Sequence, residues 1–214
     1  MQTYKSQSDI ALAVEALAAQ DEGMARAYAE YGAPPLRRGK PGFEGLIGLL
    51  ISQQVSTKAA EAIHARFHKR FPDAAPRDVL AASDEALAAV GLSRPKQRYL
   101  RILAQAIGSG QLDTEQLAAA GDDEIFAELT ALIGIGAWTA DCYLLFNLGR
   151  CDRFPAGDLA LQEGYRLLYS LNARPDAKQL ADLAQRFQPH RAAAARMIWH
   201  FYSGERAKVK LLKQ

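Results

Sequence analysis

Cysteine is scarce in this chain of 214 residues, since only Cys142 and Cys151 are present. Two cysteines at this spacing are too few for a disulfide framework, a structural zinc site or a four-cysteine iron–sulfur cluster, so these sites are excluded. No apolar run approaches the roughly 20 residues that a membrane-spanning helix needs. The first ten residues have neither the basic nor the apolar stretch of a secretion signal. We therefore expect a cytoplasmic protein that has no contact with a membrane.

An excess of charge of one sign is also lacking, because 26 Lys and Arg face 24 Asp and Glu for a net charge of +2. The distribution is uneven. Residues 102–149 contain no Lys or Arg, whereas basic residues gather at 37–40, 58–77, 94–101 and 186–213. This segregation fits a basic face that binds a polyanion, and it fits solvated helix faces equally well.

Hydrophobic periodicity is helical along nearly the whole chain, and no convincing alternating strand is present. The sequence therefore predicts an all-α protein of short helices. The predicted helices lie at 9–20, 22–31, 43–55, 57–71, 76–82, 84–90, 95–107, 114–120, 122–132, 137–148, 158–171, 176–187 and 190–203. Four polar residues at their starts are predicted N-caps, namely Thr57, Ser83, Thr114 and Asp122.

Composition shifts at one place, the stretch 32–42, which is rich in proline, glycine and basic residues. We expect residues 1–42 to form an N-terminal helical arm and linker. Residues 43–203 would then form the main body, and residues 204–214 a basic C-terminal tail.

A pair of glycines, Gly134 and Gly136, separates two predicted helices within the segment LIGIGAWTA. Glycines at this spacing permit a tight reversal with positive φ, so the flanking helices form an antiparallel hairpin. The start of the second helix then presents unpaired N–H groups, which suit an anion such as a DNA phosphate and need no lysine. Taken alone the motif is weak, because ordinary helix–helix connections use glycine as often.

An aspartate, Asp158, stands where a helix begins in the segment FPAGDLALQ. It can be a simple N-cap. A carboxylate held ionised at a helix N-terminus can also stabilise a developing oxocarbenium ion and position a water molecule, which glycosidic cleavage requires.

These two segments, in this order and about 20 residues apart, resemble the helix-hairpin-helix DNA glycosylase superfamily, and most of all its 3-methyladenine DNA glycosylase II branch. Three further segments match that branch: ISQQVS at 51–56, GLSRPK at 91–96, and PHR at 189–191 leading to IWH at 198–200. The resemblance covers roughly residues 43–203. It implies a two-lobed all-α fold with the active site in the cleft between the lobes and the hairpin at about 123–148.

Carried over to this sequence, the resemblance implies Asp158 as the catalytic carboxylate. It implies a structural Na⁺ or K⁺ on the backbone carbonyls of Thr130, Leu132 and Ile135, with no cofactor required. The implied DNA-binding residues are Gly134, Gly136, Thr139, Gln53, Gln54, Arg94 and Lys96. The implied base pocket contains Trp138, Trp199, Cys142 and Tyr143, whose tryptophans can stack on an electron-poor alkylated base. Both tryptophans can instead be core residues, and the glutamines and basic residues can be solvated surface.

Departures from the family pattern refine this expectation. Lyase-competent relatives such as endonuclease III carry a nucleophilic lysine where Trp138 stands, so no β-lyase step is expected. Cys142 replaces a tyrosine found in the pocket of some members, which leaves the base preference open.

The sequence thus predicts a monomeric, monofunctional N-glycosyl hydrolase of base excision repair. It would flip alkylated purines out of double-stranded DNA and leave an abasic site, and it would work at the bacterial nucleoid. Alternatives are a glycosylase for uracil, hypoxanthine or an oxidised purine, a non-catalytic helix-hairpin-helix DNA-binding protein, and a regulatory helical protein unrelated to DNA.

Overall fold

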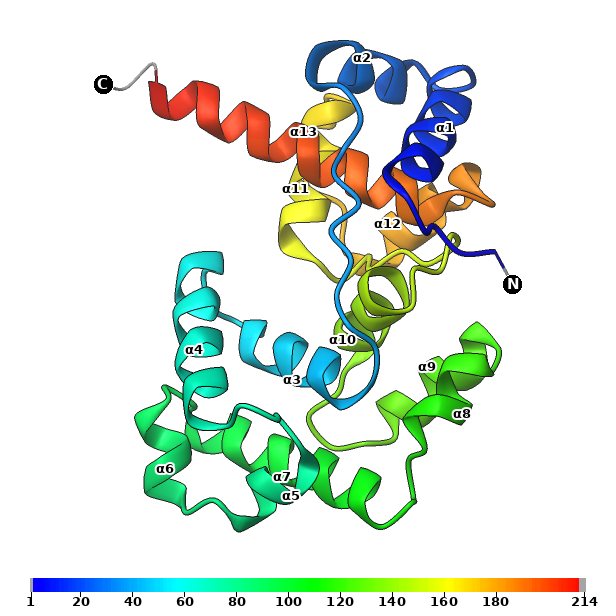
Figure 1. The fold of residues 1–214 in the computed structure, drawn as a ribbon. Helices are drawn as coiled ribbons and strands as arrows, with labels where there is room; N and C mark the ends of the chain where they lie inside the picture. Colours follow the sequence, from blue (N-terminus) through cyan, green and yellow to red (C-terminus); the bar gives the residue numbers. More distant parts are fainter. Residues whose placement is uncertain (1, 212–214) are drawn as a thin grey trace. The chain divides into compact units, whose positions relative to one another are not determined.

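Helices make up the regular structure of residues 2–211, the part of the chain that the computed structural model describes (Figure 1). The all-α prediction is confirmed. An isolated antiparallel bridge joins Thr3 and Arg150. Within the described residues, no helix is long and apolar enough to cross a membrane.

The chain folds into two compact units. The first combines Met1–Arg38 with Gly149–Gln214, and the second is the continuous segment Gly39–Leu148. This division differs from the three consecutive segments predicted from composition, because the N-terminal helices join the C-terminal third of the chain in one core. The predicted tail differs as well. Residues 204–211 continue the last helix, and residues 212–214 lie outside the described part.

The first unit is built around its longest helix, α13 (Arg191–Leu211), in which residues 192–198 are all buried. Helix α11 (Leu159–Leu168) packs closely against it, because Gly164 lacks a Cβ that would lie 2.9 Å from Cγ2 of Ile198. The other helices of this unit are α1 (Gln7–Ala18), α2 (Glu22–Tyr31), α11 (Leu159–Leu168), α12 (Ala177–Leu183) and the 3₁₀ turn η2 (Ala184–Phe187).

The second unit surrounds the apolar helix α3 (Gly42–Ser52), whose Leu46, Ile47 and Leu50 are buried. Its other elements are α4 (Thr57–Arg70), α5 (Pro76–Ala81), α6 (Asp84–Ala89), α7 (Arg94–Gly108), α8 (Thr114–Ala119), α9 (Asp122–Thr130), α10 (Ala137–Cys142) and the π-helical turn η1 (Tyr143–Asn147).

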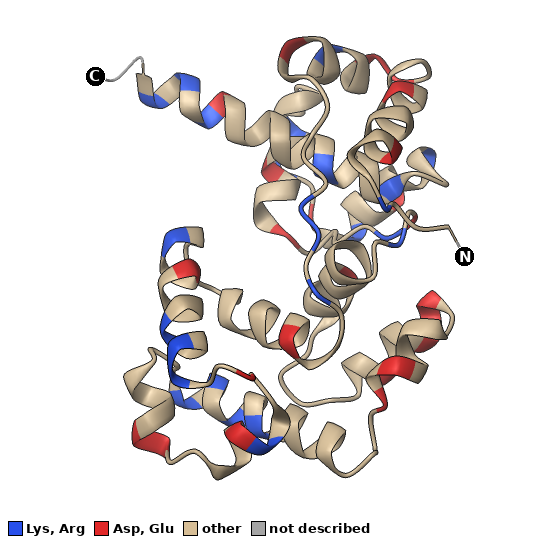
Figure 2. Ribbon diagram, in the orientation of Figure 1, with Lys and Arg blue, Asp and Glu red and all other residues tan. Residues whose placement is uncertain are grey.

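Charge is segregated between helices of this second unit. Helices α4 and α7 carry most of its Lys and Arg, whereas α8 and α9 carry acidic residues and no basic ones (Figure 2). The uneven distribution along the sequence therefore becomes an uneven distribution over separate helices.

The helix starts show how closely local sequence fixes these elements. Ser83 is an N-cap as predicted, and its hydroxyl accepts the Ala86 N–H. The other three helices begin at the predicted residues, but their N-caps lie one residue earlier than expected, at Ser56, Asp113 and Gly121. The side chains of Ser56 and Asp113 reach N–H groups of the first turn, so they cap in place of the threonine that follows each.

Candidate functional site

The glycine pair joins α9 to α10, as the sequence predicted, but its two members play different parts. Gly134 has φ +98, and a Cβ there would lie 2.2 Å from Cγ of Tyr99. Gly136 has φ −93, caps α10 without a side chain, and has no atom within 4 Å of the position of a Cβ. Only Gly134 needs the left-handed conformation; Gly136 leaves open space over the backbone at the start of α10.

Gln53 braces this hairpin from the end of α3. Its Nε2 donates to the carbonyl oxygen of Gly134 at 3.0 Å and to Oγ1 of Thr139 at 2.9 Å. Thr139 is 2% exposed. The structure thus brings together Gln53, Gly134 and Thr139, three residues predicted to bind DNA, and shows that the amide of Gln53 contacts the hairpin itself.

The remaining predicted DNA-binding residues lie outside this brace. Gln54 is exposed in the turn after α3 and has φ +54, and Arg94 is exposed at the start of α7. Lys96 is partly buried, and its amino group donates to the carbonyl oxygen of Ile51 at 2.7 Å. Burial lowers the pKa of Lys96 below its usual value. The ammonium of Lys96 therefore contacts the C-terminal turn of α3, where a cation is favourable.

Asp158 is the N-cap of α11, so it stands at the start of a helix, as the sequence predicted. Its Oδ1 accepts the backbone N–H of Leu161 at 2.8 Å and the indole Nε1–H of Trp199 at 3.0 Å. The indole comes from α13, so two helices of the first unit hold one carboxylate. Trp199, predicted as a stacking surface, is thus also a hydrogen-bond donor to Asp158.

Gln162, a residue that the sequence analysis did not single out, fixes the loop before Asp158. It is 5% exposed, and its Nε2 donates to the carbonyl oxygen of Ala156 at 2.9 Å. A buried amide one turn into α11 thereby sets the path of the loop that carries the carboxylate. The sequence signal for this role was a polar residue, Gln162, at a position of the segment FPAGDLALQ where the helix pattern calls for an apolar one.

The other predicted pocket residues belong to the second unit. Trp138 is partly buried, whereas Cys142 is 1% and Tyr143 0% exposed. The hydroxyl of Tyr143 accepts the Gly42 N–H at 2.9 Å, and burial raises the pKa of this phenol. Cys142 and Tyr143 are thus part of the buried interior of the second unit, and their pocket role stays a prediction. The predicted site in a cleft between lobes stays a prediction.

The carbonyls predicted to hold a monovalent cation lie at the hairpin turn. The oxygen of Leu132 accepts the Ile135 N–H at 3.0 Å, which closes the turn and leaves the second lone pair of that carbonyl as a possible ligand. Oxygen ligands of this kind suit a hard cation. Among the described residues, no group of three or more His, Cys, Asp or Glu could hold a metal ion.

Known proteins share both the sequence pattern and the fold. Residues 47–189 match the HhH-GPD superfamily of base excision DNA repair proteins. The chain is 35% identical over 166 residues to DNA-3-methyladenine glycosylase 1 of Schizosaccharomyces pombe. The aligned region covers 75% of this chain and 72% of that protein.

Two solved structures are similar over most of their length. One is the Schizosaccharomyces pombe 3-methyladenine DNA glycosylase in complex with abasic DNA, with a TM-score of 0.82, 33% identity, and 87% of this chain and 94% of that one covered. The other is a DNA-3-methyladenine glycosidase from Bacillus halodurans, with a TM-score of 0.75, 31% identity, and coverage of 94% and 93%. The resemblance seen in the sequence is confirmed, and the chain belongs to the HhH-GPD superfamily of base excision DNA repair proteins.

Proposed function

We propose that this protein is a DNA glycosylase that removes alkylated purines of the 3-methyladenine and 7-methylguanine type from duplex DNA. The observation that carries the proposal is the carboxylate of Asp158, held by the Leu161 N–H and the Trp199 indole at the start of α11. The names of the similar proteins, which are 3-methyladenine DNA glycosylases, support the same substrate class.

The chemistry follows from the charge of the damaged base. Alkylation at N3 or N7 makes the purine cationic, so the base leaves with little acid catalysis. Positive charge then develops on the sugar, where an ionised carboxylate stabilises it and can position the attacking water. Asp158, oriented by the Leu161 N–H and the Trp199 indole, supplies such a carboxylate. The product is an abasic site in an intact strand.

The hairpin supplies a contact to the DNA backbone in this proposal. The open space at Gly136 allows a phosphate to approach the N–H groups at the start of α10. Gln53 and Thr139 hold the turn in shape from the inner side. The complex of the Schizosaccharomyces pombe relative with abasic DNA supports DNA as the partner.

A monovalent cation completes this phosphate site in the proposal. The carbonyl oxygens of Thr130, Leu132 and Ile135 would hold Na⁺ or K⁺, and its charge would attract the phosphate in a segment free of Lys and Arg.

A lyase step is not part of the proposed reaction. Cleavage of the strand by a glycosylase needs an amine that forms a Schiff base with the sugar. The hairpin position that holds this lysine in lyase-competent relatives is Trp138 here. The DNA strand is therefore expected to break only when alkali is added after base release.

Release of free base from methylated duplex DNA tests the proposal. Wild-type protein should release 3-methyladenine, and Asp158→Asn should not, although it should bind DNA with nearly unchanged affinity. Near-wild-type release by Asp158→Asn would refute the catalytic assignment. Tight DNA binding without release from wild-type protein would refute the alkylpurine substrate and direct the search to uracil, hypoxanthine or oxidised purines.

A further inference from the structure

We propose that the ion pair between Asp152 and Arg191 positions the catalytic carboxylate, so that both are positioning residues for base release. The proposal rests on the function proposed above. It concerns the loop 152–158, which leads into α11 and ends at Asp158.

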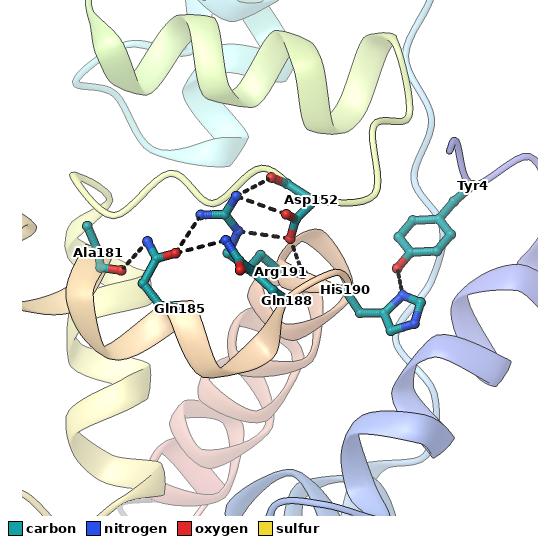
Figure 3. A network of polar contacts seen from close by, with 7 residues as sticks. All are labelled: Tyr4, Asp152, Ala181, Gln185, Gln188, His190 and Arg191. Carbon is teal, nitrogen blue, oxygen red and sulfur yellow. Dashed lines mark hydrogen bonds and ion pairs between the residues drawn. The ribbon is translucent and has the colours of Figure 1, made fainter. Parts of the chain in front are cut away.

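The pair is a two-pronged contact between this loop and the first residue of α13 (Figure 3). Nε of Arg191 donates to Oδ1 of Asp152 at 2.8 Å, and Nη2 donates to Oδ2 at 2.9 Å. Nη2 also donates to the main-chain oxygen of Asp152 at 3.0 Å. The backbone N–H of Arg191 points to Oδ1 at 3.3 Å. Asp152 therefore receives the planar guanidinium and also caps the N-terminus of α13, so its direction is fixed by several bonds.

The other end of the same loop contacts the same helix. Trp199 donates to Asp158 at 3.0 Å, and it lies eight residues after Arg191 on α13, about 12 Å along the helix axis. A rigid helix thus holds both ends of the loop. A shift of Asp152 relative to α13 must be absorbed by the six residues that follow it, and the last of these is Asp158.

Neighbouring contacts hold the start of the loop and the start of α13 together. The Ala192 N–H donates to the carbonyl oxygen of Cys151 at 2.9 Å, and the Tyr4 N–H donates to that of Gly149 at 2.8 Å. The hydroxyl of Tyr4 is hydrogen-bonded to Nδ1 of His190 at 2.8 Å (Figure 3). The N-terminal segment thereby contacts both the start of the loop and the residue before α13.

A second ion pair of the first unit provides a matched control. Arg166 and Glu163 are 2.8 Å apart, and their side chains are 29% and 28% exposed, close to the 21% and 32% of Arg191 and Asp152. The control pair lies within α11 at i, i+3, and Arg166 also donates to the carbonyl oxygen of Leu171 at 3.3 Å, beyond the end of that helix. Neither of these contacts involves the loop that leads to Asp158. Partly exposed pairs of this kind contribute little to stability by themselves. An effect on the Trp199 signal or on base release that occurs only when Arg191 is changed must therefore come from the link between the loop 152–158 and α13.

The test uses the full chain. It measures the chemical shift of the Trp199 indole N–H, which depends on the hydrogen bond to Asp158. The protein has two tryptophans, so a ¹H–¹⁵N spectrum should contain two indole signals, which Trp138→Phe assigns. In Arg191→Ala the indole signal of Trp199 should shift, while the indole signal of Trp138 should stay at its wild-type position. Glu163→Ala should shift neither. Arg191→Lys keeps the positive charge but lacks the planar guanidinium, so it should give a smaller shift of the Trp199 signal. This variant replaces Arg191→Ala in the test if the alanine variant does not fold.

Single-turnover base release and DNA affinity give the second readout. Arg191→Ala should slow base release about 10- to 100-fold through misplacement of Asp158 while DNA affinity stays unchanged. Asp152→Ala combined with Arg191→Ala should be no slower than either alone, because the two act as a unit. An unmoved Trp199 signal, or a rate equal to that of Glu163→Ala, would overturn the proposal. If wild-type protein releases no base, the proposed function fails, and the indole signals still decide the positioning role.

Discussion

Trp199 and Leu161 donate to the same carboxylate oxygen of Asp158, at 3.0 and 2.8 Å. The first bond comes from α13, and the second comes from the helix that Asp158 itself caps. The oxygen accepts both donors only when α11 and α13 keep their register. The close contact at Gly164, where α11 meets Ile198, fixes that register. Helix packing in the first unit is therefore coupled to the orientation of the carboxylate.

Replacement of Trp199 by phenylalanine removes the indole donor and keeps an aromatic ring. We expect base release to slow about tenfold or more, because Asp158 loses the indole donor, one of the bonds that orient it. The cost in folding free energy should be about 1.5–3 kcal/mol, the usual range for a hydrogen bond to a charged group. Single-turnover base release and urea unfolding measure the two effects separately.

Trp138→Phe is the control for the unfolding measurement, since Trp138 is also partly buried but lies on α10 of the other unit. It should retain the bond between Trp199 and Asp158. Base release as fast in Trp199→Phe as in wild-type protein would show that the indole donor has no part in orienting the carboxylate.

The two hairpin glycines should respond differently to alanine. Gly134→Ala places a Cβ against the ring of Tyr99 in a left-handed backbone, and we expect a loss of at least about 2 kcal/mol in unfolding free energy. Gly136→Ala meets open space at an ordinary φ, so stability should change by less than about 1 kcal/mol. Thermal and urea unfolding of both variants provide the comparison.

DNA affinity then tests what the open space at Gly136 is for. A phosphate that approaches the backbone there would meet the new methyl group, so Gly136→Ala should weaken binding to duplex DNA while the fold is intact. If the DNA affinity of Gly136→Ala equals that of wild-type protein, no phosphate binds over the backbone at Gly136.

Local signals could be predicted from the sequence because their causes are local. The glycine pair, the helix periodicity and the capping position of Asp158 each depend on residues within a few positions. The cap at Ser56 in place of the predicted Thr57 shows the precision of such signals, about one residue.

The partners of the site residues could not be predicted, because they are distant in sequence. Gln53 and Gly134 are 81 residues apart, and Asp158 and Trp199 are 41 apart. The family resemblance placed Gln53 at the DNA, whereas the fold turns its amide to the hairpin. The pairing of residues 1–38 with 149–214 likewise depends on tertiary packing, which the composition shift at 32–42 does not encode.

The burial of His64 in the second unit should make the unfolding free energy depend on pH. Its Nε2 would lie 2.9 Å from a Cβ at Gly48, so the imidazole fills the space beside that glycine of α3. Burial lowers the pKa of His64 below its usual 6.5. The neighbouring His68, at a ring distance of 4.7 Å, lowers it further, and Glu44 opposes the shift.

The sign of the effect on stability follows from proton uptake. Between the lowered pKa and 6.5 the unfolded chain binds more protons at His64 than the folded protein does, so unfolding free energy should fall as pH falls through this window. His64→Gln should flatten the dependence, and His68→Gln should largely keep it. Urea unfolding above and below pH 6.5 measures the slope. An equal slope in wild-type protein and His64→Gln would mean that the imidazole is no less hydrated in the folded state than in the unfolded chain.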